Sequence, residues 1–161
     1  MKTRQLLILF FLFSSVLQGQ KTLPKISVKS LNGASFDLNI NSEEQVLVVS
    51  FWATWCEPCI KELNAFNKNL SYLEEELNAK LLAISTDDSR TVSRIIPMMS
   101  GNSWNFEVYL DTNQDIKRAL NIIDIPHTLI IHQNKIVYEH TGYLSGDEDE
   151  LFKKIMEINN K

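Results

Sequence analysis

The sequence predicts a single α/β domain in which helices flank one central, mixed β-sheet. Three observations lead to this class. Apolar, β-branched runs alternate with helical patterns through the middle of the chain, which is typical of parallel strands joined by right-handed crossovers. Hairpin patterns stand before and after that stretch and add antiparallel strands. The chain has 161 residues, which suits one domain of ordinary size once an N-terminal leader is removed.

The first twenty residues have the pattern of a secretory signal peptide. A basic start that contains Lys2 and Arg4 precedes an unbroken apolar run at 6–13. That run is too short to span a bilayer comfortably, which takes about 20 apolar residues. An uncleaved N-terminal anchor is the alternative, because no clean cleavage site of the A-x-A type is present. We therefore expect a signal peptide at 1–20 and one domain at 21–161, exported to the periplasm or cell envelope.

The first elements of the domain are a hairpin, a buried strand and a long helix. An Asn-Gly pair at 32–33 separates alternating runs at 26–28 and 35–38, which is typical of a β-hairpin. Residues 45–52 are almost wholly apolar and β-branched, as in a strand that is buried on both faces. A helix is expected over about 57–78, because its apolar residues recur at helical spacing and a proline is tolerated in its first turn.

The rest of the chain predicts two more buried strands, weaker helices, a second hairpin and a closing helix. Pro97 is expected to interrupt or bend one of the weaker helices. The closing helix is amphipathic, and its acidic N-terminal run suits the helix dipole. The expected elements are strands at 80–85 and 106–110, helices at 88–99 and 115–120, hairpin strands at 128–132 and 135–140, and the closing helix at 147–158.

Composition disfavours several classes of partner. Of the 16 lysines and arginines, two lie in the expected leader, so 14 basic residues oppose 20 acidic ones and the mature net charge is −6. The sequence has no basic cluster, and nucleic acid or an anionic membrane surface is therefore not expected as a partner. We expect a monomer, with no later segment that crosses a membrane.

The two cysteines of the chain, Cys56 and Cys59, lie where the first buried strand gives way to the long helix. Exported proteins usually use cysteine pairs as structural disulfides, but a bridge over so short a loop gains little chain entropy. Structural zinc needs two further ligands, and the three histidines form no compact H-x3-5-H motif. A redox pair is the interpretation that remains, with no metal and no cofactor other than the Cys56–Cys59 disulfide.

Helical phase separates the roles of the two thiols. Cys56 lies at the helix N-terminus, where free N–H groups and the dipole favour a thiolate, and it is the expected, solvent-accessible nucleophile. Cys59 falls on the apolar stripe of the helix, should be buried, and is placed to resolve the mixed disulfide. Glu62 is either a proton relay for Cys59 or a solvated charge paired with a lysine. Glu57 opposes thiolate formation at Cys56, which favours a reductase.

These residues resemble a known family. The run Phe51–Cys59, Glu62 and the run Ile125–Thr128 are similar to the thioredoxin superfamily, and most of all to the TlpA/ResA-like exported thiol–disulfide oxidoreductases. The resemblance covers about residues 23–158. It implies a thioredoxin-like fold with an N-terminal β-hairpin extension. Members of the group act as reductants outside the cytoplasm, some in cytochrome c maturation, and receive electrons from a membrane thiol carrier. Disulfide-bonded proteins are the implied substrates.

The resemblance also implies a substrate-binding set. Pro126 would be cis and face the cysteine pair, with Ile125 helping to bind the incoming peptide. Trp55, Glu57 and Pro58 belong to the motif around the cysteines and complete the set.

Two positions depart from the family pattern. Ser50 stands where cytoplasmic thioredoxins carry a buried Asp, so a proton relay must use Glu62 or water instead. Asn64 stands where many relatives have a helix-kinking proline, which leaves the bend of the first long helix open.

His127 is either a partly exposed loop residue or a group that touches substrate or haem.

Two other functions are alternatives to the reductase. One is an oxidase that donates its disulfide. The other is a metal or haem chaperone that uses Cys56, Cys59 and His127, although copper-delivery relatives of the same fold generally space their cysteines one residue further apart.

Overall fold

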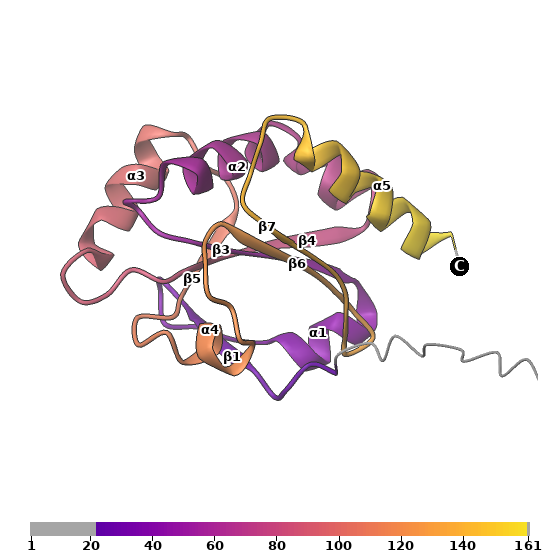
Figure 1. The fold of residues 1–161 in the computed structure, drawn as a ribbon, viewed down its shortest axis with the longest axis horizontal. Helices are drawn as coiled ribbons and strands as arrows, with labels where there is room; N and C mark the ends of the chain where they lie inside the picture. Colours follow the sequence, from indigo (N-terminus) through magenta and orange to yellow (C-terminus); the bar gives the residue numbers. More distant parts are fainter. Residues whose placement is uncertain (1–21, 161) are drawn as a thin grey trace, which may run out of the picture.

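A computed structural model describes residues 22–160, which form one seven-stranded sheet with helices on both faces (Figure 1). The expected signal peptide at 1–20 lies outside the described residues. The elements are β1 (Ser27–Ser30), β2 (Ser35–Asp37), α1 (Leu38–Glu44), β3 (Val46–Trp52), α2 (Glu57–Lys68), the π-helical turn η1 (Tyr72–Glu76), β4 (Ala79–Ser85), the 3-10 turn η2 (Val92–Arg94), α3 (Ile95–Gly101), β5 (Glu107–Leu110), α4 (Asp115–Ala119), β6 (His127–His132), β7 (Lys135–Thr141) and α5 (Asp147–Asn159).

The sheet is mixed, as expected, and its strand order is β2-β1-β5-β4-β3-β6-β7. Strands β3, β4 and β5 run parallel at its centre. The hairpin β6–β7 adds antiparallel strands at one edge, and the hairpin β1–β2 does so at the other, beside β5. In the β6–β7 turn, Gln133 and Asn134 both have positive φ, which is the conformation of a two-residue type I′ turn. Both predicted hairpins are therefore confirmed.

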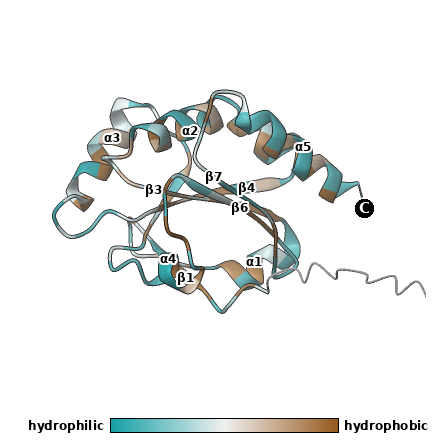
Figure 2. Ribbon diagram, viewed as in Figure 1, coloured by the Kyte–Doolittle hydropathy of each residue, from teal (hydrophilic) through white to brown (hydrophobic). Residues whose placement is uncertain are grey.

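Strand β3 forms the middle of the core, and all of its residues are buried. Because side chains alternate across a strand, Val48 and Trp52 join the apolar cluster under α2 and α5, while Leu47 and Phe51 join the cluster against α1 and α4. Figure 1 shows α2, α3 and α5 on one face of the sheet and α1 and α4 on the other. The outward surface of α5 is hydrophilic (Figure 2). No helix within residues 22–160 has both the length and the apolar character needed to cross a bilayer.

Helix α1 is a correction to the predicted hairpin, whose second strand was expected to continue to residue 38. The strand ends at Asp37, because the Asp37 carboxylate accepts hydrogen bonds from the backbone N–H groups of Asn39 and Ile40, at 2.8 and 3.1 Å. Such an N-cap is typical of Asp and starts a helix at Leu38. The cap at Asp37 therefore ends the strand one residue earlier than the alternating apolar and polar pattern predicts.

The two central helical segments also differ from the prediction. The long helix expected to reach residue 78 is interrupted after Lys68, where the side chain of Asn69 donates to the Ala65 carbonyl at 2.9 Å, and a π-helical turn follows. The helical stretch expected at 88–99 divides into η2 and α3, and Pro97 lies in the first turn of α3, where its missing N–H costs nothing. Asn64, at the position of the family's kinking proline, accepts a hydrogen bond from Trp104 Nε1 at 2.7 Å.

Candidate active site

The cysteines lie at the junction between the central strand β3 and helix α2. After β3 ends, a tight turn brings the Cys56 N–H within 3.1 Å of the Ala53 carbonyl. Cys56 is the N-cap residue of α2, with extended φ and ψ of −97° and 96°, and Pro58 lies in the first turn. No side chain caps this end of the helix, so its first N–H groups have no side-chain acceptor, and the helix N-terminus favours a thiolate at Cys56 in the reduced protein.

Cys56 and Cys59 form a disulfide, with their Cα atoms 5.3 Å apart. Cys59 is fully buried, as helical phase predicted. The expectation that Cys56 reaches solvent freely needs correction, because its residue is only 6 % exposed in this oxidised state. It packs in the same apolar cluster as Trp52 and Cys59. Trp55, at 62 % exposure, and its neighbours Glu57 and Pro58 are the exposed residues of the motif.

Glu62 is buried, so the alternative of a solvated charge paired with a lysine is wrong. The residue is 2 % exposed, and its two carboxylate oxygens accept hydrogen bonds from Ser50 Oγ at 2.7 Å and Thr128 Oγ1 at 2.8 Å. Burial raises the pKa of Glu62 to about 7, although the two hydroxyl donors oppose that rise. At i and i+3 on α2, Cys59 and Glu62 are neighbours on one helix face. A carboxyl group that titrates near neutral pH therefore lies beside the buried cysteine.

Glu57 has a different environment. It is exposed and forms an ion pair with Lys61 across one turn of α2, at 2.8 Å. The hydrogen bond and the positive charge of Lys61 lower the pKa of Glu57. Lys61 therefore compensates part of the negative charge that Glu57 places beside Cys56. Of the two acids near the cysteines, Glu62 is the one whose pKa is raised.

The peptide bond between Ile125 and Pro126 is cis, as the resemblance implies. Strand β6 begins directly after it, and the pairing of Phe51 with His127 places Pro126 beside the end of β3 that leads to the cysteines. The Pro126 carbonyl accepts a hydrogen bond from the N–H of Gly142 at 2.8 Å. Ile125 packs against both apolar clusters. The nitrogen Nδ1 of His127 lies 2.8 Å from Thr141 Oγ1.

A buried polar network that the sequence interpretation missed fixes the turn before Cys56. The carboxylate of Asp87 accepts hydrogen bonds from the Thr54 N–H at 2.8 Å, from Thr54 Oγ1 at 2.7 Å and from Ser85 Oγ at 2.8 Å. Asp87 is 1 % exposed. The pairing of Trp52 with Ser85 in the parallel strands β3 and β4 brings these segments together. The sequence feature that could have indicated this network is the polar run at 86–90, which directly follows the buried strand β4.

We expect Asp87→Asn to destabilise the oxidised protein by about 1–2 kcal/mol, because a neutral amide replaces a buried carboxylate that accepts three charge-assisted hydrogen bonds. The free energy of unfolding in urea measures this effect. Asp88→Asn is the matched control, since Asp88 is half-exposed and bonds only to Arg90 and the adjoining turn, so its unfolding midpoint should stay close to the wild-type value. Equal midpoints for the two variants would contradict the anchoring role of Asp87.

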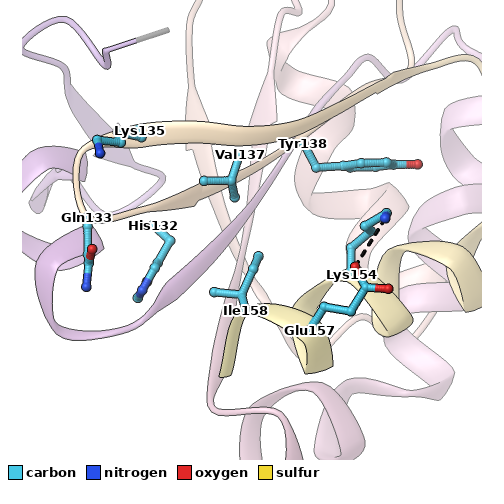
Figure 3. A pocket seen from close by; sticks show the side chains of 8 residues that line it. All are labelled: His132, Gln133, Lys135, Val137, Tyr138, Lys154, Glu157 and Ile158. Atoms are coloured by element: carbon cyan, nitrogen blue, oxygen red, sulfur yellow. Dashed lines mark hydrogen bonds and ion pairs between the residues drawn. The ribbon is translucent and has the colours of Figure 1, made fainter. Parts of the chain in front are cut away.

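A hollow of about 540 Å³ lies away from the cysteines, at the opposite end of β6 (Figure 3). The β6–β7 hairpin and the C-terminal half of α5 line it, and Lys154 and Glu157 form an ion pair at its rim, at 3.2 Å. It holds neither the disulfide nor Glu62, and we assign the chemistry to the cysteine junction. Within the described part of the chain, no group of three or more His, Cys, Asp or Glu residues is placed to hold a metal ion.

The chain is similar to known thioredoxin-like proteins. The model of the AhpC/TSA family matches residues 20–140. The thiol-disulfide oxidoreductase ResA of Bacillus subtilis is 24 % identical over 143 residues, which cover 84 % of this chain and 78 % of that protein. A thioredoxin-like protein from Porphyromonas gingivalis has a solution structure that is 39 % identical, with a TM-score of 0.71 over 84 % of this chain and 90 % of its own.

A secreted disulfide oxidoreductase of Mycobacterium tuberculosis has the same fold, with a TM-score of 0.65 at 19 % identity over 82 % of this chain and 95 % of its own. The predicted thioredoxin-like fold is therefore confirmed. Because the family model covers most of the sequence and the paired cysteines lie at the head of α2, the chain belongs to the AhpC/TSA family and is a thiol–disulfide oxidoreductase with a thioredoxin-like fold.

Proposed function

We propose that this oxidoreductase works as a reductase of disulfide-bonded proteins outside the cytoplasm. The observation that carries the proposal is Glu62, a carboxyl group with a pKa raised to about 7 by burial, one helical turn from Cys59. A negative charge at this position disfavours a thiolate in the reduced protein. Stabilisation of the reduced form is what makes a dithiol protein a strong oxidant, so its absence favours electron donation.

In the proposed cycle, the thiolate of Cys56 attacks one sulfur of the substrate disulfide, and the other substrate sulfur leaves as a thiolate. Cys59 then gives its proton to Glu62 and attacks Cys56, which releases the second substrate sulfur and forms the Cys56–Cys59 disulfide of the structure. Two electrons pass from the dithiol to the substrate. The proposed contacts for the substrate peptide are Trp55, Glu57, Pro58, Ile125 and Pro126, of which Pro126 follows a cis peptide bond and Trp55 is exposed.

Location and electron supply belong to the same proposal. The basic and apolar pattern of residues 1–20 supports export, and a structural neighbour is a secreted oxidoreductase. An oxidising compartment holds dithiols in the disulfide form, so a reductase there depends on a thiol carrier in the membrane to regenerate it. Apocytochromes c are one chemically suitable substrate class, because the paired thiols of their C-x-x-C-H site must be reduced before haem attaches.

Redox titration against glutathione tests the direction of electron flow. We expect a potential in the range of reducing thioredoxin-like proteins, at or below about −200 mV, whereas a value near about −120 mV would assign the chain as a disulfide donor. Glu62→Gln is the informative variant, since loss of the buried acid should move the potential in the oxidising direction. Glu57→Gln is its exposed control and should move it less, because Lys61 already compensates that charge.

A further inference from the structure

A cavity of about 10 Å³ lies beside the buried carboxyl group of Glu62. Its volume is on the order of the space that one water molecule occupies. Thr128, His140 and Asp147 also line it, and they come from β6, β7 and the start of α5. The cavity therefore joins the proton-accepting group of the proposed cycle to three polar side chains outside α2.

These polar side chains lead from Glu62 toward the surface. Thr128 donates to Glu62, and the register of β6 and β7 places Thr128 directly opposite His140, so the two side chains lie on one face of the sheet. The nitrogen Nε2 of His140 lies 3.2 Å from Asp147 Oδ2. The side chains of His140 and Asp147 are 35 % and 33 % exposed, and the outer end of the route thus reaches solvent.

The other residues around Glu62 are less suited to carry the proton out, although the half-exposed Glu148 also lines the cavity. Ser50 and Cys59 are fully buried, and Phe66 closes the helix side at 1 % exposure. Tyr143 also lines the cavity, but burial raises the pKa of its phenol, which donates its hydrogen to Glu148. Burial also raises the pKa of Tyr138. Neither phenol is suited to exchange protons near neutral pH, whereas imidazole is the side chain best suited to do so.

We propose that His140, held by Asp147, passes the proton of Glu62 to solvent after each reductive cycle. The inference rests on the proposed role of Glu62 as proton acceptor for Cys59. When Cys59 attacks Cys56, the thiol proton moves to the Glu62 carboxylate. The resulting carboxylic acid gives that proton, through the Thr128 hydroxyl or a water in the cavity, to the His140 imidazole, which releases it to solvent. His140 acts through Glu62 and does not touch the reacting sulfurs, so it is a positioning residue.

The test is the rate at which a preformed mixed disulfide between Cys56 and a model peptide thiol resolves, followed by acid quench and mass spectrometry. His140→Gln should slow this step roughly tenfold at pH 7, less than the 10²–10⁴-fold that direct general acid–base groups contribute. Added imidazole should restore the rate, because a small base can enter from the solvent side. His132→Gln is the matched control, since it removes a histidine from the remote hollow of Figure 3 and should resolve at the wild-type rate without a response to imidazole.

Each outcome decides the inference. A wild-type rate for His140→Gln, or a loss that imidazole does not restore, overturns the role of His140. If Glu62→Gln resolves at the wild-type rate, the relay itself fails and the inference fails with it; if Glu62→Gln is slow and His140→Gln is not, only the inference fails. Should His140→Gln not fold, as judged by its urea transition, Asp147→Asn takes its place. That variant keeps the imidazole but removes the negative charge of its partner, and an unchanged rate for it overturns the proposal.

Discussion

Replacement of Cys59 by serine is expected to turn the protein into a trap for its substrates, and replacement of Cys56 by serine is expected to abolish disulfide reduction. Cys56 stands at the helix N-terminus, where its thiolate is favoured, and it would still form the mixed disulfide in Cys59→Ser. Only Cys59, 5.3 Å away between Cα atoms and fully buried, is placed to release that adduct from within the protein. Turnover should stop in both variants, but only one should retain bound substrate.

Mass spectrometry of non-reduced adducts from the cell envelope measures the trap, and reduction of a model disulfide measures the activity. Cys56→Ser is the matched control for Cys59→Ser, because it removes one sulfur from the same short loop and should capture nothing. Adducts on Cys56→Ser in place of Cys59→Ser would reverse the assigned roles. Wild-type reduction by both variants would refute the dithiol mechanism. The identities of the trapped proteins also test the proposed substrate class, including apocytochromes c.

The chemistry of the cysteine pair could be predicted because it is local. A strand that runs into a helix fixes both the N-terminal position of Cys56 and the helical phase of Cys59, and neither depends on distant contacts. The degree of burial of Cys56 could not be obtained in this way. It depends on how the turn packs into the apolar cluster under α2, which includes residues from β5 and α5.

The burial of Glu62 could not be predicted from the sequence either. Helical phase places this residue on the flank of the apolar stripe, where exposure and burial are both reasonable. Ser50 and Thr128 decide the outcome, and they reach Glu62 only because β6 pairs with β3 beneath α2. Asp87 was missed for a related reason, since its partner Thr54 follows a different strand and becomes adjacent through the parallel register of β3 and β4.

In the fold, the elements with strong periodicity were predicted and the breaks between them were not. The apolar strands and both hairpins follow from patterns of a few residues. Helix α1 was missed because a single capping contact at Asp37 overrides the strand alternation before it. The end of α2 was missed because one side chain, Asn69, competes for a backbone carbonyl within an otherwise continuous helical pattern.

Replacement of Glu62 by glutamine is expected to stabilise the oxidised protein at pH 8 by about 2–3 kcal/mol and to change its stability little near pH 4.5. The folded-state pKa of Glu62 is about 7 and its ordinary value is 4.5, so between these values the folded protein holds a proton that the unfolded chain has lost. The free energy of unfolding of the wild type therefore falls as pH rises through that window, by at most about 3.5 kcal/mol at roughly 1.4 kcal/mol per pH unit. Glutamine resembles the protonated acid and has no such loss, and the Ser50 and Thr128 hydroxyls can bond to its amide.

Urea unfolding of the oxidised wild type and variant at pH 4.5 and pH 8 measures the effect, and groups other than Glu62 titrate alike in both proteins and cancel in the difference. Glu57→Gln is the control, because that exposed carboxylate pairs with Lys61 and should not produce a gain in stability at high pH. A stability difference between wild type and Glu62→Gln that is the same at both pH values would show that Glu62 is not held with a raised pKa. If the gain appears together with slower resolution of mixed disulfides, the buried acid is a destabilising group retained for proton transfer, as expected where stability is traded for function.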